Sequence, residues 1–275
     1  MSYETVLFET SDDKVATITL NRPQAANSFN RKMCEEFRDI WERVKIDAKI
    51  NAVVLRAAPG RAWCTGTDVH ALRNTPDDLP PEQRGGVLMY EALWNQVDPG
   101  DLLGPKANGC WKPVVAAVHG MACGGAFYWL NESDIVICSE DATFFDPHVT
   151  FGMPAVFEPL HLLRRMPLGE VLRLTLLGSA ERMSAQRALE IGFASQVVPS
   201  AELADVVTWI AESIASAPSL SIQASLRAIW LGTEMTPAQA LEIGHALVVA
   251  GSSQENLLEG QRAFTSGSRP PWRLR

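Results

Sequence analysis

Two glycine-containing turns carry the first chemical signal in the sequence. In RAWCTGTDVHAL (61–72) and in HGMACGGAFYW (119–129), an apolar strand leads into a glycine loop and then into a helix start. Backbone N–H groups at a helix N-terminus have no intrahelical partner and carry partial positive charge. Two such amides that converge on one carbonyl oxygen would form an oxyanion hole, which stabilises negative charge developing on that oxygen.

A histidine after a proline is the second candidate for chemistry. His148 lies in FFDPHVTFG (144–152), at the end of a short apolar strand, and Asp146 lies two residues earlier. Histidine can take or give a proton near physiological pH. If the strand stays extended through Pro147, the side chains of residues 146 and 148 share a face. The alternative is a core histidine that fills volume beside two phenylalanines.

An alternation of strands and helices must position these groups. Residues 4–10 and 14–20 alternate in polarity around the link SDD, which predicts a hairpin. Apolar residues at helical spacing predict a helix over 31–45, and INAVVLRA at 50–57 is typical of a buried strand. The further elements expected in this part are strands at 112–120, 133–140 and 142–147, and helices over 87–97 and 124–132.

Helical patterns dominate from residue 157 onward, with one more strand expected near residue 194. The sequence therefore predicts an α/β core over residues 1–198 and a helical C-terminal region over 199–275. That region is too small to bury a core easily by itself. We expect it to pack on the core or on another subunit.

Composition limits the class of function. Of the 275 residues, 47% are hydrophobic and 20% charged, which is typical of a globular protein. The net charge of −8 argues against nucleic-acid binding and against general attraction to anionic membranes. No secretory signal and no membrane-spanning stretch are visible in the sequence. Five scattered cysteines without CxxC spacing predict free, buried thiols in a cytoplasmic protein, and no cluster has metal-ligand spacing.

The order of several segments adds a family resemblance. Six of them closely resemble the successive motifs of the crotonase superfamily, the enoyl-CoA hydratase/isomerase family: LNRPQAANSFN, RAWCTGTDVHAL, KPVVAAVHGMACGGAFYW, SDIVIC, ATFFDPHVTFGMPA and ENLLEGQRAF. The resemblance runs from about residue 4 to residue 272 and implies a spiral of ββα units. It further implies a helical C-terminal region that forms homotrimers, often paired into hexamers.

The ligand implied by this resemblance is an acyl-CoA thioester of fatty acid metabolism. Coenzyme A enters as part of the substrate, and no separate cofactor is expected. Carried onto this sequence, the two oxyanion-hole amides are those of Thr67 and Gly125. The other residues expected to bind the acyl thioester are Thr65, Gly66, Asp68 and Gly124. The residues expected to contact coenzyme A are Arg22, Ala25, Phe264 and Arg269.

The acid–base residues depart from the family pattern. Family hydratases place one glutamate three residues beyond the oxyanion-hole glycine, where this chain has Tyr128, and a second after a proline, where it has His148. A phenol titrates at about 10 and is a poor base at neutral pH. The expected base is therefore His148, which Asp146 could orient, or Asp146 itself. Tyr128 is expected to donate a proton, orient a ligand or shape the acyl pocket. Glu158 either replaces the missing carboxylates or starts a helix.

Other residues are candidates for the same roles or for ligand contacts. Glu132, one helical turn beyond Tyr128, is a further acid–base candidate. The segment 70–111, with Trp94 and Asp98, is longer than is usual in the family and could cover the acyl pocket or contact a neighbouring subunit. AFTSGSRPPW lacks the family's Glu-Lys-Arg run, so Arg269 or Arg22 would replace a lysine on the CoA phosphates. The histidines expected to be structural are His119, His161 and His245.

Two classes of function remain open. The first is an enzyme that processes an acyl-CoA through an enolate-type intermediate, as a hydratase, an isomerase or a hydrolase. The second is a non-catalytic acyl-CoA-binding protein. They are distinguished by whether His148, Asp146 or Glu158 faces the carbonyl expected between Thr67 and Gly125.

Overall fold

The fold is described from a computed structural model, which places residues 3–70, 98–267 and 272–274. The helix predicted over 87–97, Trp94 and Arg269 lie outside these described residues.

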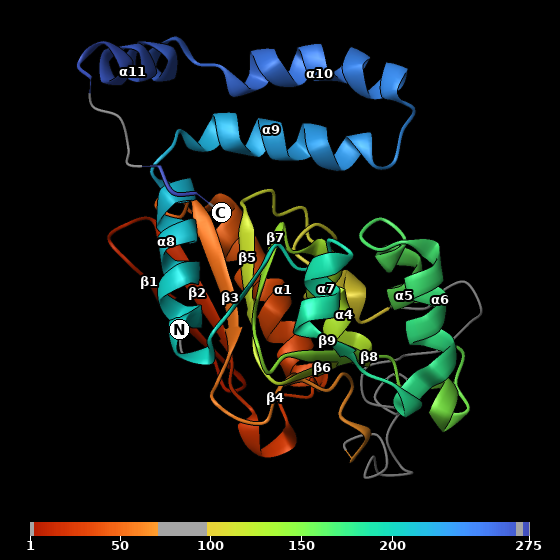
Figure 1. Ribbon diagram of the computed structural model, residues 1–275. Coiled ribbons are helices and arrows are strands. Elements are labelled where there is room, and N and C mark those ends of the chain that lie inside the picture. The colour runs from red at the N-terminus through yellow and green to blue at the C-terminus, as the bar shows by residue number, and fades with distance from the viewer. Residues whose placement is uncertain (1–2, 71–97, 268–271, 275) are drawn as a thin grey trace. The chain divides into compact units, whose positions relative to one another are not determined.

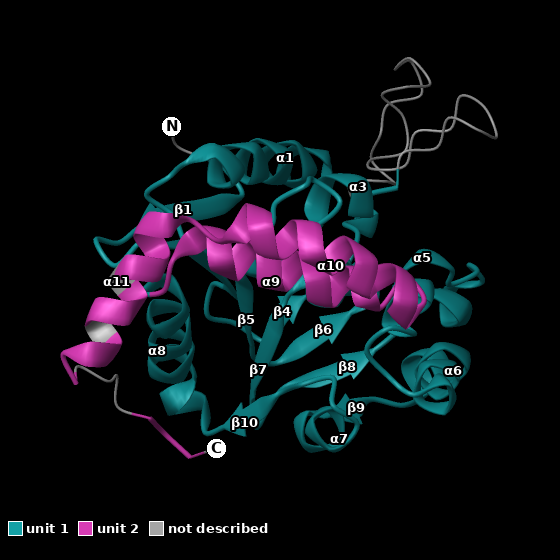
Figure 2. Ribbon diagram, turned by 90° about the horizontal axis from the view of Figure 1, so that it is seen from above, with its two compact units in different colours: residues 1–216 teal, residues 217–275 magenta. Residues whose placement is uncertain are grey.

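Two compact units make up the chain, Met1–Ser216 and Ala217–Arg275 (Figure 2). The division follows helix α8 (Leu203–Ala215), whose buried side chains pack on the sheet of the first unit. The helical region predicted from residue 199 therefore begins one helix later in the structure, because α8 completes the core.

A six-stranded sheet forms the larger layer of the first unit (Figure 1). Its strand order is β1-β2-β3-β5-β7-β10, with β1 and β2 as an antiparallel hairpin and all other neighbours parallel. Valine, isoleucine and alanine fill these strands, as expected for a sheet covered on both faces. The strands are β1 (Val6–Thr10), β2 (Val15–Leu20), β3 (Ala52–Ala57), β5 (Val114–Val118), β7 (Ile135–Ser139) and β10 (Gln196–Val198).

A second sheet of four short strands positions the residues of interest. Its order is β4-β6-β8-β9, and β4, β6 and β8 run parallel to one another. Each of these three strands directly follows a strand of the larger sheet, which produces the expected spiral of ββα units. Their carboxyl ends lie at one edge, and the two glycine turns and the Asp146–His148 segment begin there. The strands are β4 (Ala62–Cys64), β6 (Met121–Cys123), β8 (Thr143–Phe145) and β9 (Met183–Ser184).

Helices α1 (Arg31–Ile46) and α4 (Phe127–Glu132) contribute to the main hydrophobic core. Trp129 of α4 is fully buried, with its ring centroid 4.9 Å from that of Phe37, 5.7 Å from that of Phe29 and 6.0 Å from that of Trp63. This aromatic cluster fixes α4, the helix that follows the second glycine turn. The other α-helices described in the first unit, outside the segment 71–97, are α3 (Gly100–Leu103), α5 (Phe157–Leu162), α6 (Leu168–Leu177) and α7 (Ala185–Glu190).

The second unit consists of α9 (Ser219–Gly232), α10 (Pro237–Gly251) and α11 (Gln254–Thr265). Gly251 allows α9 and α10 to approach closely, since an added Cβ there would lie 2.4 Å from Cβ of Ala224. Thr236 and Gln239 form a capping box that starts α10. In the parts of the chain that the structure describes, no helix is long and apolar enough to cross a membrane.

All five cysteines are buried with free thiols, as predicted. Burial raises the pKa of the Cys34, Cys123 and Cys138 thiols to about 12. These thiols behave as small apolar side chains rather than as nucleophiles.

Candidate active site

The second glycine loop places the Gly125 amide at the start of a helix, where it has no acceptor within that helix. β6 ends at Cys123, and the 3₁₀ turn η3 (Gly124–Ala126) leads directly into α4. Gly124 has a φ of +54°, in the left-handed region that glycine adopts without strain. The amide of Gly125 lies in the first turn, where N–H groups have no intrahelical acceptor.

The first glycine loop is held by a bridge to Phe29. The Phe29 amide donates to the Gly66 carbonyl (2.9 Å), and the Asp68 amide donates to the Phe29 carbonyl (2.8 Å). The N–H of Thr67, between these two contacts, takes no part in the bridge. It remains available to an acceptor from outside the loop.

Glycine packing brings the two loops together. A Cβ atom built on Gly66 would lie 2.9 Å from the nitrogen of Gly125, which is too close for any side chain. A Cβ atom on Gly125 would lie 2.5 Å from Cε1 of Phe29 and 3.3 Å from Cδ2 of Tyr128. The two loops therefore pack this closely only because both positions are glycine.

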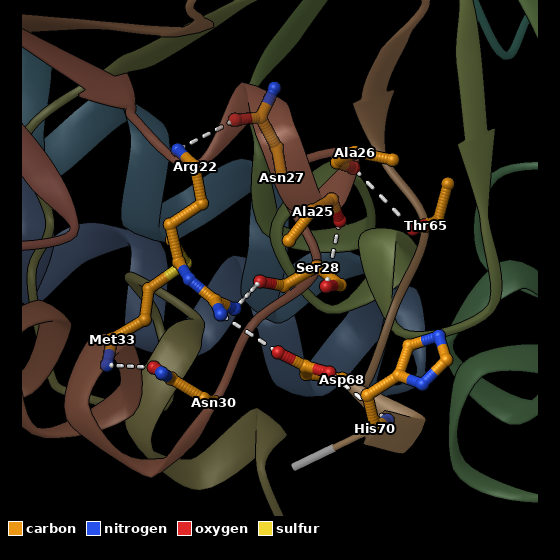
Figure 3. Close-up of polar contacts among 10 residues, drawn as sticks. All are labelled: Arg22, Ala25, Ala26, Asn27, Ser28, Asn30, Met33, Thr65, Asp68 and His70. Atoms are coloured by element: carbon orange, nitrogen blue, oxygen red, sulfur yellow. Dashed lines mark hydrogen bonds and ion pairs between the residues drawn. The ribbon is translucent and has the colours of Figure 1, made fainter.

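An ion pair ties the first glycine loop to the preceding turn (Figure 3). The guanidinium of Arg22 donates to Asp68 Oδ2 (2.8 Å) and to the Ser28 carbonyl (2.6 Å). Both side chains are largely buried, at 16% and 10% exposure. Arg22 and Asp68, predicted to contact coenzyme A and the acyl group, thus also hold each other and order the loop.

Thr65 and Ala25 flank this ion pair (Figure 3). The Thr65 hydroxyl donates to the carbonyl of Ala26 (3.4 Å), and Ala25 closes the 3₁₀ turn η1 (Pro23–Ala25). Ala26 and Asn27 both have positive φ, near +50°, so the chain turns sharply here. Asn27 stabilises the turn because its side chain accepts from the Arg22 amide and donates to the carbonyl of Ala62.

The segment after β8 turns instead of continuing the strand. Pro147 has helical backbone angles (φ −83°, ψ −6°), and the 3₁₀ helix η4 (His148–Phe151) begins at the next residue. The extended conformation considered for Pro147 is therefore wrong. Asp146 and His148 meet through the turn: Asp146 Oδ1 accepts from the His148 amide (3.0 Å) and lies 2.5 Å from its Nδ1.

Asp146 fixes the orientation and the tautomer of His148. The Asp146 side chain is fully buried, and a carboxylate can only accept, so Nδ1 carries the proton. Nε2 is then the ring nitrogen left for proton transfer. The hydrogen bond that His148 donates to Asp146 raises the pKa of His148, and the charge of Glu158 acts in the same direction against the effect of burial.

The His148 ring lies against the second glycine loop. A Cβ atom built on Gly124 would lie 3.7 Å from Cε1 of the imidazole and 3.5 Å from Cδ of Pro147. The residue expected as the base therefore lies beside the loop that carries the Gly125 amide.

Glu158, at the start of α5, lies near Nε2 of His148, the ring nitrogen that Asp146 does not contact. Its Oε1 lies 3.8 Å from Nε2 of His148, and the residue is only 3% exposed. The Asn131 side chain donates to the Glu158 carbonyl (3.0 Å) and ties α5 to α4. Burial raises the pKa of the Glu158 carboxyl, while the charge of His148 opposes the rise.

Tyr128 belongs to the same group of side chains, together with Asp98, which was not predicted as a site residue from the sequence. Its hydroxyl donates to Asp98 Oδ1 at 2.6 Å. Burial, with the nearby charges of Glu158 and Asp98, raises the pKa of Tyr128, so the phenol stays protonated and is no base. Burial also raises the pKa of Asp98. We refer to these residues as the proton-transfer cluster: Asp98, Tyr128, Asp146, His148 and Glu158.

Comparison with known proteins identifies the family of this chain. The family model for enoyl-CoA hydratase/isomerase matches residues 10–275. The chain belongs to the enoyl-CoA hydratase/isomerase family. It is 33% identical to (E)-benzylidenesuccinyl-CoA hydratase of Thauera aromatica over 94% of this chain and 95% of that protein. It is 30% identical to carnitinyl-CoA dehydratase of Proteus mirabilis over 97% of each chain.

Solved structures support the same assignment. An enoyl-CoA hydratase/isomerase from Mycobacterium paratuberculosis superposes with a TM-score of 0.82, at 34% identity and with all of both chains covered. The expected crotonase fold is thereby confirmed. As a member of the enoyl-CoA hydratase/isomerase family, the chain is an acyl-CoA-processing enzyme of the lyase type.

Three other residues singled out from the sequence have structural contacts of their own or belong to the second unit. Glu132 accepts from the amides of Lys106 (2.6 Å) and Ala107 (3.0 Å), so it holds the loop after α3. His161 lies 3.2 Å from an Arg164 guanidinium nitrogen, through its Nδ1. Phe264 is 68% exposed on α11, within the second unit.

Proposed function

We propose that this enzyme adds water reversibly across the double bond of a 2-enoyl-CoA thioester. The observation that carries the proposal is the His148 imidazole: buried Asp146 fixes it, its Nε2 lies 3.8 Å from Glu158 Oε1, and the ring lies against the second glycine loop. A base beside the Gly125 amide favours catalysis over simple binding, because general acid–base groups must lie within reach of the reacting atoms.

In the proposed reaction, the thioester carbonyl oxygen accepts hydrogen bonds from the Thr67 and Gly125 amides. His148 Nε2 takes a proton from water as its oxygen attacks the β-carbon, and the electrons of the double bond move onto the thioester oxygen. The two amides stabilise the resulting enolate. Glu158 then delivers a proton to the α-carbon, which yields the 3-hydroxyacyl-CoA. The same groups acting in reverse perform dehydration.

The similarity to a hydratase and a dehydratase supports this reaction over isomerisation or thioester hydrolysis. In both names the chemistry is gain or loss of water. The proposed substrate is a 2-enoyl thioester with either an alkyl or an aryl substituent. Coenzyme A would lie near Arg22 and Ala25, the coenzyme A contacts predicted within the first unit.

Product analysis tests the proposal. The protein is incubated with crotonyl-CoA, a long-chain 2-enoyl-CoA and cinnamoyl-CoA, and products are separated and weighed by mass spectrometry. We expect a water adduct with the thioester intact, reduced at least about 100-fold in His148→Ala. His161→Ala is the matched control, because this histidine lies on α5 outside the proton-transfer cluster, and should keep full activity.

Other outcomes would reject the hydratase proposal in distinct ways. Release of free coenzyme A would identify a thioester hydrolase, and a shifted double bond would identify an isomerase. Binding of all three thioesters without any product would identify a non-catalytic acyl-CoA-binding protein.

We also propose that the second unit mediates assembly into homotrimers, or hexamers made of two trimers. Within that unit the exposed fractions of large apolar side chains are high, and a lone chain would leave them in water: Ile229 69%, Leu241 73%, Val248 67% and Val249 77%. Light scattering coupled to size-exclusion chromatography should give three or six times the chain mass. A monomer at micromolar concentration would contradict this proposal.

A further inference from the structure

The direction of the Thr67 N–H bond is set by the peptide group to which it belongs. That group also contains the Gly66 carbonyl, and the peptide is trans. In a trans peptide the C=O and N–H bonds point in nearly opposite directions. The Gly66 carbonyl accepts from the Phe29 amide at 2.9 Å. This contact therefore aims the Thr67 N–H away from Phe29.

The Phe29 amide belongs in turn to a peptide group that Arg22 holds. That peptide contains the Ser28 carbonyl, which accepts from the Arg22 guanidinium at 2.6 Å (Figure 3). A cation thus donates to one peptide group, and that group donates to a second, whose N–H is that of Thr67. We refer to this series as the amide relay: the Arg22 guanidinium, the Ser28–Phe29 peptide and the Gly66–Thr67 peptide.

The amide relay is buried, and its cation is fixed from a second side. Ser28 is 6% exposed and Phe29 is fully buried. Hydrogen bonds in series polarise one another, and each is stronger away from water. Asp68 accepts from the other arm of the guanidinium at 2.8 Å, and its own amide donates to the Phe29 carbonyl at 2.8 Å. Because this carboxylate offsets part of the charge of Arg22, we expect the relay to act more on the orientation of the Thr67 amide than on its polarity.

We propose that Arg22 is a positioning residue of the oxyanion hole: it orients and polarises the Thr67 amide through the amide relay, and its ion pair with Asp68 keeps it in place. The inference rests on the proposed function, in which the Thr67 amide donates to the thioester oxygen. It gives Arg22 a role in turnover that is separate from any contact with coenzyme A.

Two thioesters of different length separate these roles. Crotonyl-CoA and crotonyl-pantetheine carry the same reacting group, but the second lacks the nucleotide. In Arg22→Met we expect kcat to fall about 10- to 100-fold with both thioesters and KM to change little, because a misdirected donor costs less than the loss of a whole one. A cation that acts only on the phosphates of coenzyme A would instead raise KM for crotonyl-CoA alone and leave kcat unchanged. That result would overturn the proposal.

Two further variants show whether the forked contact matters. Arg22→Lys keeps the charge, but an ammonium does not reproduce the planar fork that spans the Ser28 carbonyl and Asp68, so it should recover only part of the kcat. Lys106→Met is the matched control. It breaks another buried ion pair, with Asp134 at 2.9 Å, outside the candidate site, and should leave kcat unchanged. An equal loss of kcat in Lys106→Met and Arg22→Met would overturn the proposal, because destabilisation alone would then explain both.

Infrared spectra of bound butyryl-CoA, labelled with carbon-13 at the carbonyl, give a readout without turnover. This saturated thioester has no double bond to hydrate. Hydrogen bonds from the oxyanion hole lower the stretching frequency of the carbonyl, and we expect a smaller lowering in Arg22→Met than in the wild type. An equal lowering in both proteins would overturn the amide relay even if the wild type hydrates crotonyl-CoA. The expected spectra without any hydration by the wild type would support the relay and reject only the proposed reaction.

Discussion

The candidate site has two halves, one formed by backbone amides and the other by side chains. The glycine loops present backbone amides, and their position depends on the absence of side chains at Gly66 and Gly125. The proton-transfer cluster presents side chains on the turn after β8, on α4, on α5 and before α3. The first half cannot be altered without moving the backbone. The second can be exchanged one side chain at a time, so the same pair of glycine loops can be combined with different titratable side chains.

Gly125→Ala should have the largest effect, because it acts on the backbone half. Its Cβ would lie 2.5 Å from the Phe29 ring, so the ring or the loop must move and the Gly125 amide is displaced. Loss of one oxyanion donor costs about 100- to 1000-fold in kcat, and we expect a loss in this range by steady-state kinetics.

Gly169→Ala is the matched control for that substitution. Gly169 lies in α6, and an added Cβ would meet no atom within 4 Å. Its kcat should equal that of the wild type. Full activity in Gly125→Ala would show that the glycine loops do not hold the reacting carbonyl.

Asp146→Asn should have the next largest effect, on the side-chain half. The hydrogen bond that His148 donates to Asp146 raises the pKa of His148. Neutral His148, and with it activity, should therefore appear only as pH rises through that raised value. Removing the carboxylate should move the acid limb of the pH–rate profile to lower pH. Without the carboxylate, His148 can also adopt the wrong tautomer, which should reduce the maximal rate by about 100-fold or more. An acid limb at unchanged pH would argue that His148 is not the base.

Glu132→Gln should change stability without changing chemistry. Glu132 lies one helical turn from Tyr128, but its carboxylate accepts from two backbone amides outside the proton-transfer cluster. Loss of a charged acceptor should lower the free energy of unfolding by about 1–2 kcal/mol, measured by denaturant titration. A large loss of kcat in a folded Glu132→Gln protein would place this residue in the reaction after all.

Glu158→Gln should give the smallest effect on stability, with a sign that depends on pH. The pKa of Glu158 is raised by burial, so its contribution to stability is present below the unfolded pKa and is lost as pH rises through the folded one. The glutamine side chain of the variant does not titrate, so its Tm should match the wild type below the pKa of an unfolded glutamate, exceed it increasingly as pH rises toward the raised folded pKa, and keep a constant lead above that value. A variant less stable at every pH would show that the carboxyl is needed for packing.

Much of the backbone half was predictable from the sequence, because glycine leaves a local signature. Gly66 and Gly125 closely follow apolar strands, and the composition of the two turns alone indicates where they lie. The main strands and the helix over 31–45 were predicted within a few residues from apolar periodicity.

The side-chain half was predictable only in part, because it depends on contacts between distant segments. Asp98 and Tyr128 are 30 residues apart, and no local pattern connects them. Asp146 and His148 were paired for the wrong reason, since Pro147 turns the chain where an extended strand was considered. The burial of Glu158 depends on the packing of α5 against α4, which Asn131 secures.

The buried thiols give the protein internal reporters of motion. Cys64 ends β4 and Cys123 ends β6, directly before the two glycine loops, and both thiols are inaccessible with raised pKa values. A thiol reagent can reach them only when these strand ends open, so the labelling rate measures the free energy of that local opening. A bound acyl thioester that bridges the loops would slow labelling at these two positions and leave Cys138, in the larger sheet, as the internal reference.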